Sequence, residues 1–409
     1  MGVRIPHPLT RNVLSFLRTF FLFSVIINMR SLMFFLSYWW INMIKAGKLR
    51  LLPTKEQELL FFSFCNISRF AYNESLSFKI SMYNDGIFVG VQECIDHIKD
   101  LKYSEEYSWI KLAPEAVTKQ AIRDMNRSFT LFFKRGNKGF PKYKKKSKTR
   151  PSFYQRTDRF YQIDENHVRI TGIKQPVKCI KTQLPNKIVN TRVIYDGKYW
   201  FLTYSYYYEA EIVELTDEVL GVDLGVRNMA TCSDGRIFKN INKEPRIIKL
   251  EKRKKLIQRK IARKYKCNSR KSNNIIKLEN DLRTINRKIF NIRNNYLHCM
   301  TKELVRNKPK AIVIEDLSVC DMAKTKLLNR YIYDANFSRI RKYLEYKTNE
   351  YGIKLVIADR YYPSTKKCSC CGNIIEKMSL DNRIYECKKC GMTMDRDLNA
   401  SINLKNYYC

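Results

Sequence analysis

Three acidic residues in the C-terminal half of the chain stand in settings that suit metal chemistry. Asp223 lies in the segment Gly-Val-Asp-Leu-Gly (residues 221–225), Glu315 ends the apolar run Ala-Ile-Val-Ile, and Asp397 lies in Asp-Arg-Asp-Leu-Asn-Ala (residues 395–400). Carboxylate oxygens are the ligands that Mg2+ prefers, and a paired-metal site needs several of them while it holds a phosphodiester in line for attack. Two acids on strands and one at the start of a late helix therefore predict a nuclease.

Four cysteines further along the chain have the spacing of a structural metal site. They form two C-x2-C pairs, Cys368 with Cys371 and Cys387 with Cys390, separated by fifteen residues. Each pair can close one side of a tetrahedral Zn2+, and the glycine that follows it eases the turn. The spacing predicts a zinc ribbon over residues 366–391. Such a closed four-sulfur site leaves no open position for catalysis, and Cys370 has the wrong spacing to join it.

The composition points to a polyanionic partner. Lys and Arg number 77 against 39 Asp and Glu, so the formal net charge is +38. Nucleic acid is the leading candidate, because binding a membrane surface would require the basic residues on amphipathic helices, and here they fall mostly in loops and long helices. With only 4 His, a Ser-His-Asp or His-metal hydrolase is poorly supported. The clustered cysteines favour metal in a reducing compartment, which predicts a cytoplasmic, nucleoid-associated location in a prokaryote.

The segments around the acids have the patterns of buried strands. Residues 219–224 and 311–315 are apolar almost throughout, and residues 228–232 read as a neighbouring strand that a turn at Asp234-Gly235 closes. Asp316, one residue beyond Glu315, should point to the opposite face if its strand continues, because side chains alternate along a strand.

A strongly basic helical pair is predicted between the two acid-bearing strands. Residues 249–293 hold 17 Lys or Arg against 3 Asp or Glu, and apolar residues recur at intervals of three and four from Leu278 onward. This stripe predicts two antiparallel helices, joined near residues 269–274, within residues 249–306. The stripe should pack in a core, and the charged faces are candidates for contact with nucleic acid.

The N-terminal half reads as strands with helices inserted among them. Residues 44–51 alternate apolar with basic or small residues and stop at Pro53, and Thr54 then begins a helical pattern that continues to about residue 135. Short strands follow over residues 152–210, where Asp196-Gly197 is a strong hairpin signal. The pattern predicts a small barrel or sandwich with a helical insertion.

A basic stretch with interleaved aromatic residues follows the helical part. Nine Lys and Arg fall between Lys134 and Arg150, interleaved with Phe140, Tyr143 and Phe153. Basic side chains neutralise phosphates and exposed rings stack on bases, so the stretch is a candidate nucleic-acid contact; a solvated basic loop is the alternative.

Residues 1–42 differ from the rest of the chain. They carry four Arg and no acid around two apolar runs, which resembles a signal or anchor segment. Arg18 and Arg30 split the runs, so neither reaches the ~18 uncharged residues of a spanning helix. We interpret the segment as a translated leader, with the functional protein beginning at Met43; a membrane anchor and an unexplained extension are the alternatives.

The order of these features closely resembles the TnpB family, the OrfB-type insertion-sequence proteins. The resemblance rests on the acid-bearing strands, the basic helical pair, the zinc ribbon and the segment Asp-Arg-Asp-Leu-Asn-Ala, and on residues 43–46, 51–57, 70–73 and 140–144. It implies an α/β plus β-barrel chain: a RuvC-like nuclease domain of RNase H-like fold over residues 216–409, with the helical pair and zinc ribbon inserted. A wedge-like barrel with a helical recognition insertion, residues 43–210, would precede it.

The resemblance also implies an activity and its partners. The protein would be a transposon-encoded DNA endonuclease, guided to double-stranded DNA by an RNA from the end of its own element. Asp223, Glu315 and Asp397 match the three catalytic acids of the family and would coordinate two Mg2+ ions, one activating water and the other stabilising the leaving 3′ oxygen. Asp395 is the rival for the third acid. Strand exchange would belong to a separate Tyr-dependent transposase, and no membrane partner is expected.

Two other classes of protein are weaker fits. The segment around Asp223 also resembles the first phosphate strand of actin-like ATPases, which need later Gly-rich loops, whereas this chain has only 14 Gly. A catalytically inactive nucleic-acid-binding or accessory transposase protein, or a repressor, would explain the charge and the zinc ribbon. Clustered carboxylates argue against it, because their mutual repulsion is unfavourable unless a metal offsets it.

Overall fold

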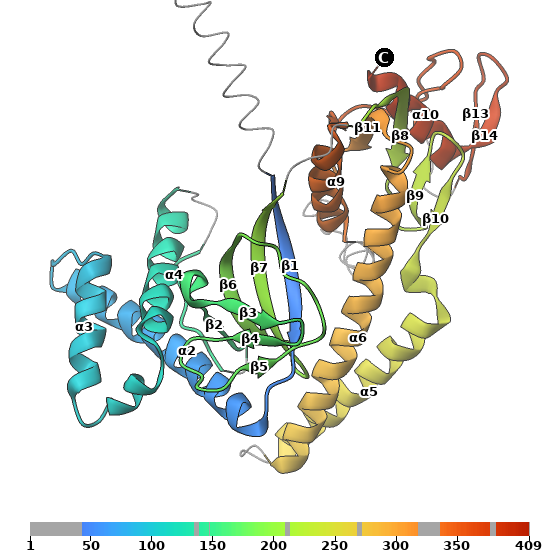
Figure 1. Cartoon of the computed structure of the whole chain (residues 1–409). Coiled ribbons are helices and arrows are strands. Elements are labelled where there is room, and N and C mark those ends of the chain that lie inside the picture. Colours follow the sequence, from blue (N-terminus) through green and yellow to red (C-terminus); the bar gives the residue numbers. More distant parts are fainter. Residues whose placement is uncertain are drawn as a thin grey trace, which may run out of the picture. The chain divides into compact units, whose positions relative to one another are not determined.

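The computed structural model describes residues 43–134, 139–146, 148–208, 213–267, 272–317, 336–376 and 382–408. Residues 1–42, to which the leader hypothesis applies, lie outside these ranges. Within them, no helix combines the length and the apolar character that crossing a bilayer requires. The described residues form two compact units, one from residues up to 195 with 199–210, and one from residues 196–198 with 211 onward (Figure 1).

Unit 1 contains two antiparallel sheets. The first has the strand order β1-β7-β6-β2 and the second the order β3-β4-β5. A β-bridge between Leu51 and Cys179 joins the end of β1 to the segment that follows β5. The predicted hairpin is present: Asp196-Gly197 connects β6 to β7, and Gly197 has a positive φ of 99°. The strands are β1 (Met43–Leu51), β2 (Ser152–Tyr154), β3 (Tyr161–Asp164), β4 (His167–Arg169), β5 (Val177–Lys178), β6 (Ile188–Tyr195) and β7 (Trp200–Tyr208).

Three helices and a short 3-10 turn separate β1 from β2 along the chain. They are α2 (Lys55–Asn84), α3 (Val91–Tyr103), η1 (Ser108–Leu112) and α4 (Glu115–Lys134); a second 3-10 turn, η2 (Thr157–Arg159), follows β2. The start of α2 is as predicted, because the Thr54 side chain accepts from the Gln57 backbone N–H while the Gln57 side chain accepts from the Thr54 N–H. Phe61 and Phe64 of α2 pack against Phe153, with ring centroids 5.5 and 5.3 Å away.

Unit 2 is built on a mixed five-stranded sheet with the order β10-β9-β8-β11-β12. β8 runs parallel to β11 and β11 parallel to β12, whereas β9 and β10 form antiparallel pairs. The strands are β8 (Thr216–Asp223), β9 (Asn228–Cys232), β10 (Ile237–Lys239), β11 (Pro309–Glu315) and β12 (Lys354–Ala358). The strand predicted at residues 228–232 is confirmed.

Both faces of the central strands are buried, which explains their apolar runs. On one face, Leu220, Val222, Ile312 and Ile314 join a core with the helices α5 (Pro245–Cys267), α6 (Asn273–Leu304) and α9 (Phe337–Tyr351). On the other face, Val219, Ala311 and Val313 pack with Leu404 of the C-terminal helix α10 (Arg396–Tyr408). Each strand residue therefore faces one layer or the other according to its parity.

The basic helical pair is also present, and α5 and α6 lie side by side in Figure 1. α5 begins after the 3-10 turn η3 (Ile241–Lys243), four residues before the predicted start at 249. α6 begins after Ser272, whose hydroxyl accepts from the Ile275 N–H at 3.4 Å. Ile257 of α5 and Ile285 and Ile289 of α6 are buried in the same core, so the apolar stripe does pack inward.

Candidate functional site

Asp223 and Glu315 are the last residues of neighbouring parallel strands. The register pairs Val222 of β8 with Ile314 of β11, so the two acids that follow lie side by side at the same edge of the sheet. Side chains alternate along a strand, and both acids share the parity of the residues that face α10. The fold thus directs the two carboxylates toward the same helix.

α10 reaches this face through a backbone-to-backbone contact at Gly221. A Cβ atom at position 221 would lie 1.9 Å from the Ser401 carbonyl oxygen and 2.5 Å from the Lys405 nitrogen. Only glycine admits this approach, because every other residue carries a Cβ. The contact anchors α10 against β8, and Asp397 stands in the first turn of that helix.

The electrostatics of Asp223 show that the acids have been brought together. Burial raises the pKa of Asp223 well above its ordinary value of 3.8; Glu315 and then Asp397 raise it further, while Arg396 acts in the opposite direction. Burial also raises the pKa of Glu315, against a hydrogen bond that its Oε1 accepts from the Ser364 hydroxyl. The Arg396 Nε lies 3.7 Å from Asp397 Oδ1. This concentration of negative charge is an environment that a divalent cation would stabilise.

Asp395 and Asp316, the two acids next to the predicted site residues, have structural partners. Asp395 Oδ1 accepts from the backbone N–H groups of Asp397 at 2.9 Å and Leu398 at 3.1 Å, so it caps the start of α10. Asp316 forms ion pairs with Arg341 of α9 at 3.3 Å and with Arg360 at 3.0 Å. β11 ends at Glu315, so Asp316 lies just beyond the strand, and its pairing with Arg341 directs it to α9 instead of α10.

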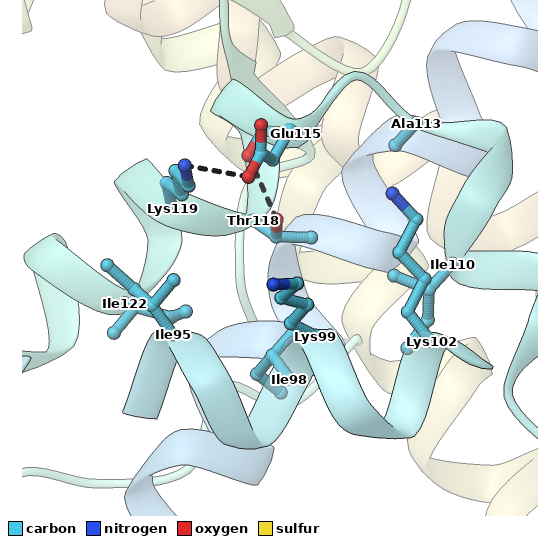
Figure 2. A pocket seen from close by; sticks show the side chains of 10 residues that line it. All are labelled: Ile95, Ile98, Lys99, Lys102, Ile110, Ala113, Glu115, Thr118, Lys119 and Ile122. Carbon is cyan, nitrogen blue, oxygen red and sulfur yellow. Dashed lines mark hydrogen bonds and ion pairs between the residues drawn. The ribbon is translucent and has the colours of Figure 1, made fainter. Parts of the chain in front are cut away.

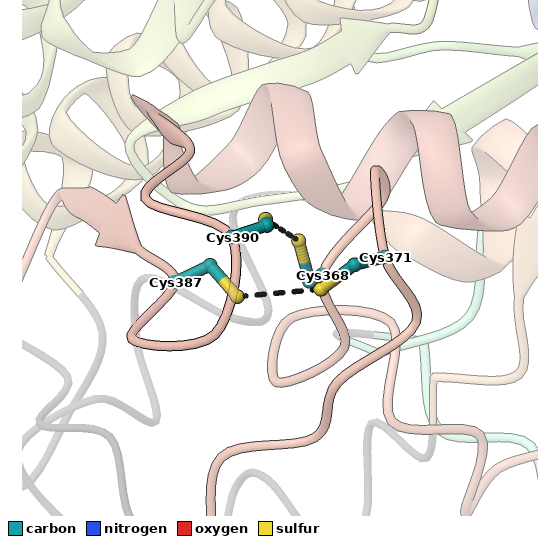
Figure 3. A group of neighbouring side chains, drawn as sticks. All are labelled: Cys368, Cys371, Cys387 and Cys390. Atoms are coloured by element: carbon teal, nitrogen blue, oxygen red, sulfur yellow. Dashed lines mark hydrogen bonds between the residues drawn. The ribbon is translucent and has the colours of Figure 1, made fainter.

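The four cysteines of the two C-x2-C pairs form one cluster, drawn in Figure 3. Their sulfur atoms all lie within 4.8 Å of one another; Cys368 and Cys390 are 3.6 Å apart, and Cys371 and Cys387 are 3.5 Å apart. Zn–S bonds of ~2.3 Å in a tetrahedron place sulfurs ~3.8 Å apart, so the cluster fits a four-thiolate metal site. Cys370 is exposed and outside the cluster.

The loops that carry these cysteines have the backbone geometry of metal knuckles. Gly372 and Gly391 adopt φ values of 74° and 73°, and their N–H groups donate to the carbonyls of Cys368 and Cys387. The hairpin β13 (Ile384–Glu386) and β14 (Thr393–Asp395) continues the second loop. Backbone hydrogen bonds, that of the Cys390 N–H foremost, lower the pKa of the Cys387 thiol to about 6, whereas the pKa values of the Cys371 and Cys390 thiols in the same cluster are raised.

In unit 1 the basic stretch is fastened to helix α2. The Asn73 side chain donates to the Lys144 carbonyl at 3.1 Å and accepts from its N–H at 2.7 Å, and the Lys144 ammonium lies 3.6 Å from the centroid of the Tyr72 ring. Burial lowers the pKa of Lys144 to about 8. Two segments on which the family resemblance rests, residues 70–73 and 140–144, are thus in direct contact.

The exposure of the interleaved aromatic residues corrects one prediction. Phe140 and Tyr143 are 48% and 51% exposed and remain available for stacking, but Phe153 is only 1% exposed. It belongs to the inward-facing position of β2 and fills the core beneath α2, so it cannot stack on a base. Of the basic residues in this stretch, those described as exposed are Lys134, Lys142, Lys145, Lys146, Lys148 and Arg150.

A second basic feature of unit 1 is a small pocket between α3, η1 and α4, shown in Figure 2. Isoleucines form its floor, and Lys99, Lys102 and Lys119 stand at its rim beside Glu115. Lys119 forms an ion pair with Glu115 at 2.7 Å, and this hydrogen bond is the main reason that the pKa of Glu115 is lowered.

Three family models match the chain in succession. Residues 43–87 match a model described as "Helix-turn-helix domain", residues 203–326 one described as "Probable transposase", and residues 337–404 one described as "Cas12f1-like, TNB domain". In this structure residues 43–87 consist of β1, the single long helix α2 and the turn after it.

Two relatives are similar to this chain over most of its length. A protein of Streptomyces pristinaespiralis named "Putative RNA-guided DNA endonuclease" is 28% identical over 88% of each chain. "Putative RNA-guided DNA endonuclease InsQ" of Escherichia coli K12 is 27% identical over 88% of this chain and 91% of its own.

Among solved structures, the protein chain of the Cas12f1-sgRNA-target DNA complex shares the fold with a TM-score of 0.56 at 13% identity, over 89% of this chain and 99% of that one. The two chains therefore share a mixed α/β fold. The three matching models and the two relatives that span most of the chain support the TnpB family of OrfB-type insertion-sequence proteins, to which this chain is similar.

Proposed function

We propose that this protein is a transposon-encoded, RNA-guided DNA endonuclease whose nuclease centre consists of Asp223, Glu315 and Asp397. The observation that carries the proposal is the meeting of these acids: two end adjacent parallel strands with the same parity, and the third stands in the first turn of the helix packed against that face. The sheet order, with an antiparallel hairpin beside three parallel strands, supports an RNase H-like fold of the RuvC type.

The acids would hold two Mg2+ ions, which when bound activate a water molecule and stabilise the leaving 3′ oxygen of a phosphodiester. Asp223 at the end of β8, Glu315 at the end of β11 and Asp397 in the first turn of α10 would be the ligands.

Asp397 is the third acid in this proposal, and Asp395 is the helix cap. Asp397 is 16% exposed. The charge of Asp397 raises the pKa of Asp223 more than the charge of Asp395 does. Asp395 is exposed and its Oδ1 is already engaged by two backbone N–H groups. Asp397→Ala should abolish cleavage, whereas Asp395→Ala should cost about 0.5–2 kcal/mol of stability as a lost cap and leave residual cleavage.

The cysteine cluster is proposed to bind a structural Zn2+, since four sulfurs close the coordination sphere and leave no place for substrate. The partners would be a guide RNA from the element's end and a double-stranded DNA target. Both relatives are named as RNA-guided DNA endonucleases, and the net charge of +38 suits an RNA–DNA duplex. Strand exchange itself is assigned to a separate Tyr-dependent transposase.

The decisive experiment is to purify the protein from cells that carry its native locus and to sequence the RNA that copurifies. A discrete RNA from the element's end is expected, and the complex should cut a library of targets with randomised flanks in Mg2+. Asp223→Ala should abolish cutting while RNA and DNA binding stay near the wild-type level. If the wild-type complex binds this RNA and matching DNA but cuts no flank in Mg2+, the protein is an inactive nucleic-acid-binding member of the family instead.

A further inference from the structure

A buried hydroxyl outside the three acids touches the proposed nuclease centre. The Ser364 side chain donates a hydrogen bond to Glu315 Oε1, and Ser364 is only 2% exposed. Ser364 lies in the segment between β12 and Cys368, 49 residues from Glu315 in the sequence. A carboxylate that accepts a fixed bond on one oxygen has a defined rotamer, which leaves its other oxygen to point in one direction.

The segment that carries Ser364 is fastened to α10. The Asn403 side chain donates to the Ser364 carbonyl at 2.8 Å and to the Lys367 carbonyl at 2.6 Å. The Asn399 side chain donates to the same Lys367 carbonyl at 2.7 Å and accepts from the Ser369 N–H at 3.0 Å. Both asparagines are at most 1% exposed, so their bonds are made away from water, where an unmade bond would be costly.

This network connects three parts of the fold that lie far apart in the sequence. α10 carries Asp397 in its first turn and Asn399 and Asn403 in the following turns, so the helix that presents one acid also holds the serine that contacts another. The same bonds flank Cys368, the first cysteine of the metal cluster. A shift of the first cysteine loop would therefore move Ser364 relative to Glu315.

We infer that Ser364 is a positioning residue that orients Glu315 for metal binding, and that the first loop of the cysteine cluster forms part of the scaffold of the nuclease centre. The inference rests on the proposed nuclease function only where the test measures cleavage; the measurement of Mg2+ binding does not depend on cleavage. Hydrogen bonds to metal ligands fix their orientation, and losing such a partner typically lowers metal affinity or activity by about 10- to 100-fold.

The test compares Ser364→Ala with Ser364→Thr, which keeps the hydroxyl, and with Ser401→Ala as a matched control. Ser401 is also buried, but its hydroxyl donates to the Leu398 carbonyl at 2.7 Å instead of to a carboxylate. Two quantities are measured on the protein with its bound RNA: the Mg2+ concentration that gives half of the Mg2+-induced rise in melting temperature, and the same midpoint for the cleavage rate. Binding of target DNA is measured alongside.

Ser364→Ala should raise both Mg2+ midpoints by about 10- to 100-fold while target DNA affinity stays within about twofold. Ser364→Thr should restore the midpoints, even if its added methyl group lowers the melting temperature without Mg2+, and Ser401→Ala should leave them unchanged. The inference would be overturned if Ser364→Ala had the same Mg2+ midpoints as wild type. It would also be overturned if Ser364→Thr and Ser401→Ala shifted the midpoints as much as Ser364→Ala does. A wild-type complex that shows a Mg2+-dependent melting shift but never cuts would instead contradict the proposed function, and the melting midpoints would still decide the role of Ser364.

Discussion

Replacing Gly221 with alanine tests how α10 delivers Asp397. The new Cβ would lie 1.9 Å from the Ser401 carbonyl oxygen and 2.5 Å from the Lys405 nitrogen, both backbone atoms that cannot rotate aside. Ordinary van der Waals contact begins at 3.4 Å, so α10 must retreat from β8 by about 1.5 Å at Ser401. Asp397 stands one helical turn before Ser401 and would move with it.

Gly221→Ala should destabilise the protein, whereas a Gly→Ala change at an unhindered position commonly stabilises one. Where the space is open, Gly→Ala commonly stabilises by about 0.4–1 kcal/mol, because the unfolded chain loses freedom. Here overpacking should cost about 1–3 kcal/mol, or a fall of about 2–12 °C in melting temperature for a unit of about 200 residues. The cleavage rate should fall by about 100-fold, since a 1 Å misplacement of catalytic groups can cost that much.

The measurements are thermal unfolding and single-turnover cleavage, with Gly225→Ala as the control. That glycine follows β8, and a Cβ there would meet only the Asn228 carbonyl oxygen, at 3.1 Å, a clash that small adjustments relieve. Gly225→Ala should therefore lose less stability and less activity than Gly221→Ala. A Gly221→Ala protein with wild-type melting temperature and rate would refute the close contact between α10 and β8, and with it the placement of Asp397.

Three further outcomes are expected. Cys387→Ser should abolish zinc binding, measured by metal analysis, and lower the melting temperature. Cys370→Ser should bind zinc and melt like wild type, because Cys387 is one of the four clustered cysteines and Cys370 is not. The pKa of Asp223 is raised in the folded state, so the folded protein binds this proton more tightly than the unfolded chain does. In EDTA, the stability that the protonated Asp223 contributes is therefore present at acid pH. It is lost as the pH rises above 3.8 and through the folded-state pKa. The stability difference between Asp223→Asn and wild type in EDTA should accordingly grow in favour of Asp223→Asn over that range, and a pH-independent difference would contradict it. Asn73→Ala should destabilise unit 1 by about 1–3 kcal/mol in urea unfolding, because it removes both hydrogen bonds to the Lys144 backbone; Asn73→Asp, which keeps the acceptor, should lose less.

Local features of the chain were predictable because they depend on backbone geometry and side-chain period. The capping box at Thr54, the hairpin at Asp196-Gly197 and the antiparallel pair α5 and α6 all follow from short-range rules, and the structure has each of them. The four cysteines were recognisable for the same reason, because each C-x2-C turn supplies one half of the cluster.

The predictions failed where burial depends on tertiary packing. Phe153 reads in sequence as one more aromatic residue beside a basic stretch, yet β2 turns it into the core of unit 1. Strand β12 and helix α9 were not identified, because their short or mixed patterns are distinctive only once they pack against β11 and its core.

The sequence by itself predicted the three acids and the two cysteine pairs, and it determined the strands that carry Asp223 and Glu315. Only the tertiary structure decided how they combine: the close approach of α10 at Gly221 and the bond from Ser364 to Glu315. The physical reason is range. Period and turn chemistry act over a few neighbouring residues, whereas these contacts join positions about 50 to 180 residues apart, and only the packing of the folded chain brings such positions together.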